Sequence, residues 1–166
     1  LQIRGFRGGQ YRKFYKQCFV ELQKRNTKTL IIDLRNNGGG RLNEINKLYS
    51  YLADSTYTFL KKSEVVSRGS LFEGAYFNKG NVVVKAVKAL FSPLVYSYLL
   101  INVHKDKDGK NYFGTETKPH QLNKNAFNGK LYVLINGASF SASSILSTNL
   151  KGAQRATFVG EETGGD

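Results

Sequence analysis

Hydrophobic and polar residues alternate along the chain with two different periods. Short apolar runs that end in glycine, asparagine or polar residues predict strands over residues 1–6, 29–34, 56–61, 131–136 and 156–160. Apolar residues that recur every three or four positions predict helices over residues 11–25, 42–54 and 141–151. Strands and helices therefore follow one another along most of the chain, which predicts an α/β domain.

The middle of the chain departs from this alternation. Two lysines and a proline interrupt the apolar stretch 82–101, and the remaining run is too short to span about 30 Å of hydrocarbon. We expect a helix there, followed by a strand over 95–103 that pairs with residues 112–117 through a turn at Asp108-Gly109. The sequence therefore predicts an inserted segment and no transmembrane helix. It also contains no signal peptide and no internal repeat.

The segment 131–145 carries the strongest candidate chemistry. It leads from an apolar strand through Asn136-Gly137 to a cluster of serines at the start of a helix. A hydroxyl at such a junction lies beside backbone amides that have no partner within the helix, and these amides can stabilise an oxyanion. The alternative is that the serines only cap the helix, since serine is preferred there. The G-x-S-x-G motif of the α/β-hydrolases is absent.

The apolar run 30–34 predicts a second buried strand, which ends in two asparagines and three successive glycines, Gly38-Gly39-Gly40. Glycine permits a positive φ and allows the backbone to approach a ligand closely. Phosphate is one ligand of such loops, but neither Gly-Lys-Ser/Thr nor G-x-G-x-x-G is present, so a nucleotide loop is not expected. A tight turn without a ligand is the simplest alternative.

Three segments, taken in order, resemble peptidase family S41. They are D-L-R-x-N-G-G-G at 33–40, S-F-S-A-S at 139–143 and V-G-E-E-T-G-G at 159–165. The family comprises the C-terminal (tail-specific) processing proteases and their tricorn and retinoid-binding-protein relatives. The motif sequences here are most similar to those of its Bacteroidetes-type members. The resemblance implies a crotonase/ClpP-like ββα core. We therefore expect residues 1–166 to be the peptidase catalytic domain, truncated at both ends, with no PDZ domain within these residues. The resemblance also implies an extracytoplasmic protein of the periplasm or cell envelope.

The resemblance further implies a nucleophile, an oxyanion hole and supporting residues. These are Ser141; Gly38, Gly39 and Ala142; and Ser139, Ser143 and Asp166. The oxyanion hole would use the amide of the residue after the nucleophile and an amide of the glycine loop. No metal ligand and no cofactor is implied.

The general base is where the sequence departs from the family. A serine hydroxyl is too weak an acid to react without a base. The lysine that serves the processing proteases is matched here by Asp166, and aspartate ordinarily has a pKa of about 3.9. The histidines His104 and His120 both fall in predicted loops. Either the base lies outside this chain, or the protein is an inactive relative that keeps the peptide groove.

Composition limits the remaining function classes. With 166 residues, 40% hydrophobic and 13% aromatic, the chain is expected to fold as one globular domain. Its 25 basic and 12 acidic residues give a net charge of +13, which could attract nucleic acid, anionic membranes or acidic peptides. The basic residues are scattered and form no nucleic-acid motif, so a solvated basic surface is predicted. Cys18 is the only cysteine and falls on an apolar helix face, which predicts a core thiol and excludes an intrachain disulfide.

These observations lead us to predict a serine endopeptidase that cleaves peptides or unfolded proteins through an acyl-enzyme at Ser141. We expect the substrate backbone to bind partly as an added strand. The alternative is a catalytically inactive relative that binds peptides or another ligand. A third hypothesis is a basic module that binds nucleic acid or membranes.

Overall fold

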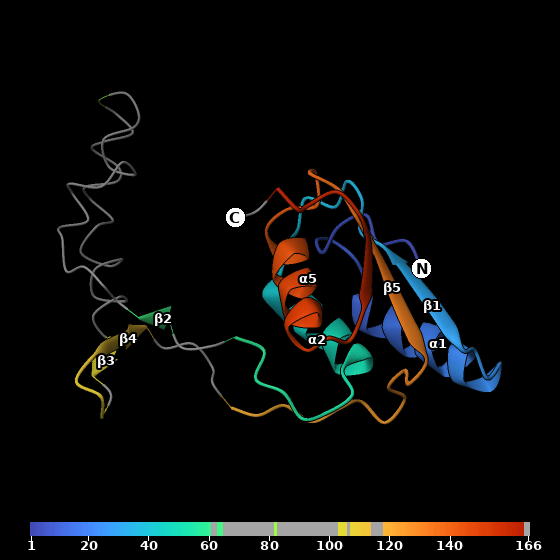
Figure 1. The fold of residues 1–166 in the computed structure, drawn as a ribbon, viewed down its shortest axis with the longest axis horizontal. Helices are drawn as coiled ribbons and strands as arrows, with labels where there is room; N and C mark the ends of the chain where they lie inside the picture. Colours follow the sequence, from blue (N-terminus) through green and yellow to red (C-terminus); the bar gives the residue numbers. More distant parts are fainter. Residues whose placement is uncertain (61–62, 65–81, 83–102, 106, 114–117, 165–166) are drawn as a thin grey trace. The chain divides into compact units, whose positions relative to one another are not determined.

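The chain divides into two compact units in the computed structural model, which describes residues 1–60, 63–64, 82, 103–105, 107–113 and 118–164. The first unit comprises Leu1–Phe59 and Pro119–Asp166, and the second comprises Leu60–Lys118. The first unit contains the three-stranded sheet and the long helices (Figure 1). It also contains all three segments on which the family resemblance rests.

Strands and helices alternate in the first unit, as the hydrophobic pattern predicts. Its elements in chain order are α1 (Tyr11–Lys24), β1 (Thr29–Asp33), α2 (Leu42–Leu52), β5 (Lys130–Ile135), α5 (Ala142–Gly152) and β6 (Thr157–Gly160). The strands form a parallel sheet in the order β1-β5-β6. The α/β prediction is therefore confirmed, and the helix boundaries differ from the predicted ones by one or two residues.

The core of the first unit lies between the sheet and the helices, and α2 packs against both α1 and α5. Side chains from strands and helices share this core, among them Ile32, Leu34, Val133, Leu48, Leu146 and Leu150, each 0% exposed. Ile31 is 50% exposed, and burial alternates along β1. Only one face of this strand is therefore packed against the core. The apolar run 30–34 suggested a strand buried throughout, and that expectation is wrong for the face that carries Ile31.

Two segments predicted as strands, residues 1–6 and 56–61, form only isolated β-bridges in the described residues. Residues 1–6 meet the rest of the unit at two isolated parallel bridges, Gln2 with Asp33 and Phe6 with Gly40. The chain has more residues between Asp33 and Gly40 than between Gln2 and Phe6. The two segments therefore cannot pair residue by residue between the bridges, and no continuous ladder forms. Residues 56–60 contain one bridge, Tyr57 with His120.

The Phe59 carbonyl accepts a hydrogen bond from Asn149 Nδ2 at 3.1 Å, which ties the end of this segment to α5. Residue 61 lies outside the described residues.

The second unit contains an antiparallel sheet in the order β2 (Ser63–Glu64), β4 (Asn111–Phe113), β3 (Val103–Lys105). β3 and β4 are joined through Asp108-Gly109, where Gly109 has φ +81° and Lys110 N donates to Asp108 Oδ1 at 2.9 Å. The predicted hairpin is thus confirmed over these residues. The expected helix after residue 82 and the outer parts of both predicted strands lie outside the described residues. No helix in the described part of the chain is both long and apolar enough to cross a membrane.

Candidate functional site

The loops that follow β1 and β5 meet at one edge of the sheet, because the two strands are parallel neighbours. Asn36 N donates to Asn136 Oδ1, and Asn136 Nδ2 donates to Asn36 Oδ1, both at 3.0 Å. Leu34 N also donates to Leu134 O at 2.9 Å. Side chains one hundred positions apart therefore hold the glycine loop and the serine loop together.

Ser141 lies immediately before α5 in a backbone conformation that is uncommon for a residue with a side chain. Its φ is +55° and its ψ is −115°. Such conformations cost of order 1–3 kcal/mol and often occur at functional sites, where the surrounding structure maintains them. Ser141 is exposed, and its side chain makes no capping hydrogen bond with α5. The capping interpretation is therefore wrong for Ser141, which presents an accessible hydroxyl.

Gly39 lies against Ser141. A methyl group placed on Gly39 would lie 2.8 Å from Ser141 Cβ, 2.8 Å from Ala142 N and 2.6 Å from Phe140 O, and Gly39 has φ +91°. Both the crowding and the left-handed backbone require glycine. The glycine loop thus touches the candidate nucleophile and the amide that follows it in the sequence.

The candidate oxyanion donors differ in how the fold uses them. Gly39 N donates to Asn37 Oδ1 at 2.9 Å. Ala142 N begins α5 and has no partner within the helix, as expected of a first-turn amide. Nothing lies within 4 Å of the position that a side chain on Gly38 would take, so the Gly38 backbone is accessible.

Ser139 and Ser143 are fully buried and join the two loops. Ser139 Oγ donates to Leu34 O at 2.8 Å and accepts from Asn136 N at 3.1 Å. Ser143 Oγ donates to Asn37 O at 2.9 Å. The three serines of the cluster therefore differ in environment, since two are bound inside the protein and Ser141 faces solvent.

Asn37 is the residue of this site that sequence reasoning missed. Its side chain is fully buried, and its Nδ2 donates to Ile3 O at 2.7 Å while its Oδ1 accepts from Gly39. Its backbone carbonyl accepts from Phe140 N and from Ser143 Oγ, both at 2.9 Å. The available signal was its position before three glycines, where asparagine favours turns through side-chain hydrogen bonds.

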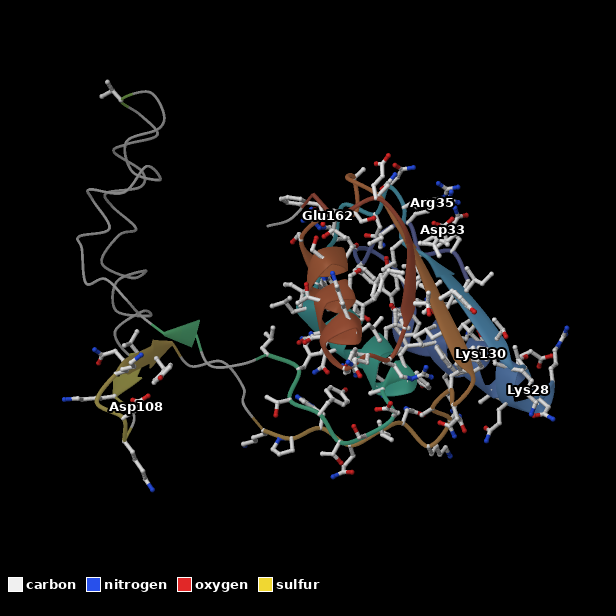
Figure 2. All side chains as sticks on the ribbon, viewed as in Figure 1. Lys28, Asp33, Arg35, Asp108, Lys130 and Glu162 are labelled. Atoms are coloured by element: carbon white, nitrogen blue, oxygen red, sulfur yellow. The ribbon has the colours of Figure 1, made fainter. Side chains whose placement is uncertain are left out.

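Asp33 and Arg35 form a two-point ion pair at the end of β1, and Figure 2 shows them side by side. Arg35 Nε donates to Asp33 Oδ1 at 2.9 Å, and a terminal guanidinium nitrogen lies 2.8 Å from Oδ2. The Arg35 hydrogen bonds lower the pKa of Asp33 to about 2, and the same pairing raises the pKa of Arg35. A carboxylate held in this way is a poor proton acceptor.

The third motif reaches the serine loop through its backbone. Gly164 N donates to Ser139 O at 3.1 Å, and a methyl group on Gly164 would lie 2.2 Å from Gly137 O. Asp166 lies outside the described residues. The structure therefore brings all three segments of the resemblance together.

Neither histidine is placed beside Ser141 by the described residues. The His120 ring stacks on Tyr57, whose ring contacts Tyr49, and the Tyr49 hydroxyl donates to Asn149 O at 3.3 Å. Asn149 lies two turns along α5 from Ser141, which is about 12 Å at 1.5 Å per residue. The side chain of His104 is outside the described part of the structure. No cluster of three or more histidine, cysteine, aspartate or glutamate side chains occurs among the described residues.

Comparison with known proteins gives a family match and several structural relatives. The family profile described as peptidase family S41 matches residues 1–166. No curated protein sequence matches significantly. The photosystem II D1 C-terminal processing protease is 21% identical with a TM-score of 0.57, over 98% of this chain and 30% of that one. Mature CPAF complexed with lactacystin is 20% identical with a TM-score of 0.61, over 98% of this chain and 37% of that one. The chain thus shares their fold and spans about a third of their length.

Proposed function

Because the chain belongs to peptidase family S41, a family of serine-type peptidases, we propose that it hydrolyses peptide bonds through an acyl-enzyme on Ser141. The observation that carries this proposal is the environment of Ser141, which is exposed, makes no capping hydrogen bond and packs with its Cβ against Gly39, next to the Ala142 amide. The family also supports a crotonase/ClpP-like ββα core for the parallel sheet, and assignment of residues 1–166 to the catalytic domain.

The reaction begins with attack of Ser141 Oγ on the carbonyl carbon of the scissile peptide bond. The carbonyl oxygen becomes an oxyanion, which the Ala142 amide and an amide of the glycine loop stabilise. Each such donor is typically worth about 3–4 kcal/mol in the transition state. Collapse of this intermediate expels the amine and leaves an ester on Ser141. Water then hydrolyses the ester and restores the hydroxyl.

Two glycine-loop amides are candidates for the second oxyanion donor. Gly39 N already donates to Asn37 Oδ1, so it must exchange that bond for one to the substrate oxygen. Gly38 carries no side chain that would block a substrate, and its surroundings are open. In both cases the donor is a backbone group, so substitutions act by moving the loop.

The hydroxyl proton of Ser141 must pass to a general base, and neither Asp33 nor His120 fits that role. Asp33 is bound to Arg35 with a lowered pKa, and His120 lies near the far end of α5. Asp166, at the position of the family lysine, keeps its predicted supporting role. No base for Ser141 is identified among the described residues, which also favours the second candidate, an inactive relative that binds peptides or another ligand.

The proposed substrates are peptides or unfolded proteins, bound partly as an added strand. The D1 relative is by name a C-terminal processing protease, and we infer the same kind of cleavage here. Membership of the family supports an extracytoplasmic location in the periplasm or cell envelope.

A fluorophosphonate probe tests the nucleophile directly, because it reacts covalently with activated serines. We expect mass spectrometry to find one adduct on Ser141 and an unfolded protein substrate to be cleaved. Both signals should disappear in Ser141→Ala. They should persist in Ser55→Ala, which removes another exposed serine, one that hydrogen-bonds to Asp54. If the unmodified protein showed no adduct and no cleavage, and bound peptides as tightly as Ser141→Ala does, the protein would be a binding protein instead.

A further inference from the structure

A cavity of about 410 Å³, open to solvent, lies on the first unit between α1, α2 and the segment 120–123. It adjoins the stacked rings of Tyr57 and His120, which place it toward the far end of α5 from Ser141. Ten residues line it, and none of them is aspartate or glutamate. The proposed peptidase reaction makes no use of this cavity.

Basic side chains enter the cavity from both helices. Arg12 comes from α1 and Lys47 from α2. Lys47 Nζ lies 5.5 Å from the centroid of the Tyr51 ring, a cation–π contact that restrains the ammonium group. The acidic residue of α2, Glu44, does not line the cavity. It lies near Tyr15, whose pKa is raised by burial first and by the Glu44 charge second. The charged groups that line the cavity are therefore positive.

Three of the four side-chain amides that line the cavity have an oxygen that accepts a hydrogen bond within the fold. Asn46 Oδ1 accepts from the Tyr57 hydroxyl at 3.0 Å, and Gln121 Oε1 accepts from Thr56 Oγ1 at 3.4 Å. Asn123 Oδ1 accepts from the backbone amide two residues further on. Burial raises the pKa of Tyr57 to about 12, so its phenol keeps the proton that it donates to Asn46. The NH₂ groups of Asn46 and Gln121 are thus turned away from these bonds and can donate to a ligand.

We propose that this cavity binds an oxyanion, a carboxylate or phosphate group carried by a larger ligand. Such groups have only acceptors, which match guanidinium, ammonium and amide donors. The volume lies within the roughly 300–1,000 Å³ of small-molecule sites and exceeds what a lone anion fills. An acidic peptide segment or a phosphorylated small molecule would both present this chemistry.

The test measures binding by isothermal titration calorimetry with tetraglutamate and, separately, with inorganic phosphate. Tetraglutamine serves as the uncharged peptide. The Ser141→Ala background prevents hydrolysis and makes the result independent of the proposed peptidase activity. Loss of one charge-assisted hydrogen bond should weaken binding about tenfold or more, so we expect this for Lys47→Gln and for Arg12→Gln.

Lys130→Gln is the matched control, since it removes one positive charge from an exposed residue at the start of β5, outside the cavity (Figure 2). It should weaken binding by less than about twofold. Tight tetraglutamate binding that depends on Lys47 identifies a peptide carboxylate, and phosphate binding with the same dependence identifies a phosphate group. Equal weakening by Lys47→Gln and Lys130→Gln, or binding of tetraglutamine as tight as that of tetraglutamate, would overturn the proposal.

Discussion

Replacing Gly39 with alanine adds one methyl group where the glycine loop touches the serine loop. The methyl carbon would lie 2.6 Å from Phe140 O and 2.8 Å from both Ala142 N and Ser141 Cβ. None of these atoms belongs to the flexible end of a side chain. The glycine loop or the start of α5 must therefore move to accommodate the methyl group.

The expected cost has two parts. Alanine in a left-handed conformation costs about 1–2 kcal/mol, and overpacking of a closely packed region costs about 1–3 kcal/mol. Gly39→Ala should therefore lower the free energy of unfolding by roughly 2–5 kcal/mol. A displacement of about 1 Å at the oxyanion donors should also slow acylation of Ser141 about 100-fold.

Gly152→Ala is the control for this prediction. Its methyl group would meet no atom within 4 Å, the φ of Gly152 lies outside the left-handed region, and Gly152 ends α5 away from the glycine loop. This variant should lose no stability in urea unfolding, and its rate of fluorophosphonate labelling should stay near that of the unmodified protein. If Gly39→Ala were as stable and as reactive as Gly152→Ala, the inferred contact between the two loops would be wrong.

Other predictions concern the same loops. Ser143→Ala should lower the free energy of unfolding by about 1 kcal/mol, whereas Ser141→Ala should change it by less than about 0.5 kcal/mol and abolish labelling. Equal destabilisation would contradict the two environments. Asn37→Ala should cost more, about 2–5 kcal/mol in urea unfolding, because two buried backbone groups lose their partners. Arg35 holds the pKa of Asp33 at about 2, so the ion pair should stabilise the fold above about pH 4 and lose that effect toward pH 2. Asp33→Asn should flatten this part of the unfolding profile, and an unchanged slope would refute the pairing.

The sequence predicts the strands and helices of the first unit well because each is specified by its own periodicity. Leu30, Ile32 and Val133 alternate with less buried positions, and that local pattern needs no knowledge of distant residues. It also predicts that the loops after the strands at 29–34 and 131–136 carry the chemistry. The family motifs then indicate which serine to examine.

Features that depend on distant partners are less visible in the sequence. The importance of Asn37 comes from the carbonyl of Ile3 and from Ser143, which lie 34 and 106 positions away. The broken pairing of residues 1–6 depends on how far the glycine loop projects between two bridges. The apolar pattern alone also cannot show that Ile31 stays half exposed, since burial depends on what covers the other face.

The register of β1 with β5 has a consequence for how the protein folds. Thr29 pairs with Lys130, and all of the second unit lies between them in the sequence. Contacts of such long sequence separation form slowly, because the chain must first close a large loop. The free-energy cost of closing this loop depends only weakly on its length, since doubling the number of residues between β1 and β5 would add about 0.6 kcal/mol. We therefore expect Ser141 to meet its glycine loop late in folding, so that a chain still emerging from the ribosome carries no assembled nucleophile.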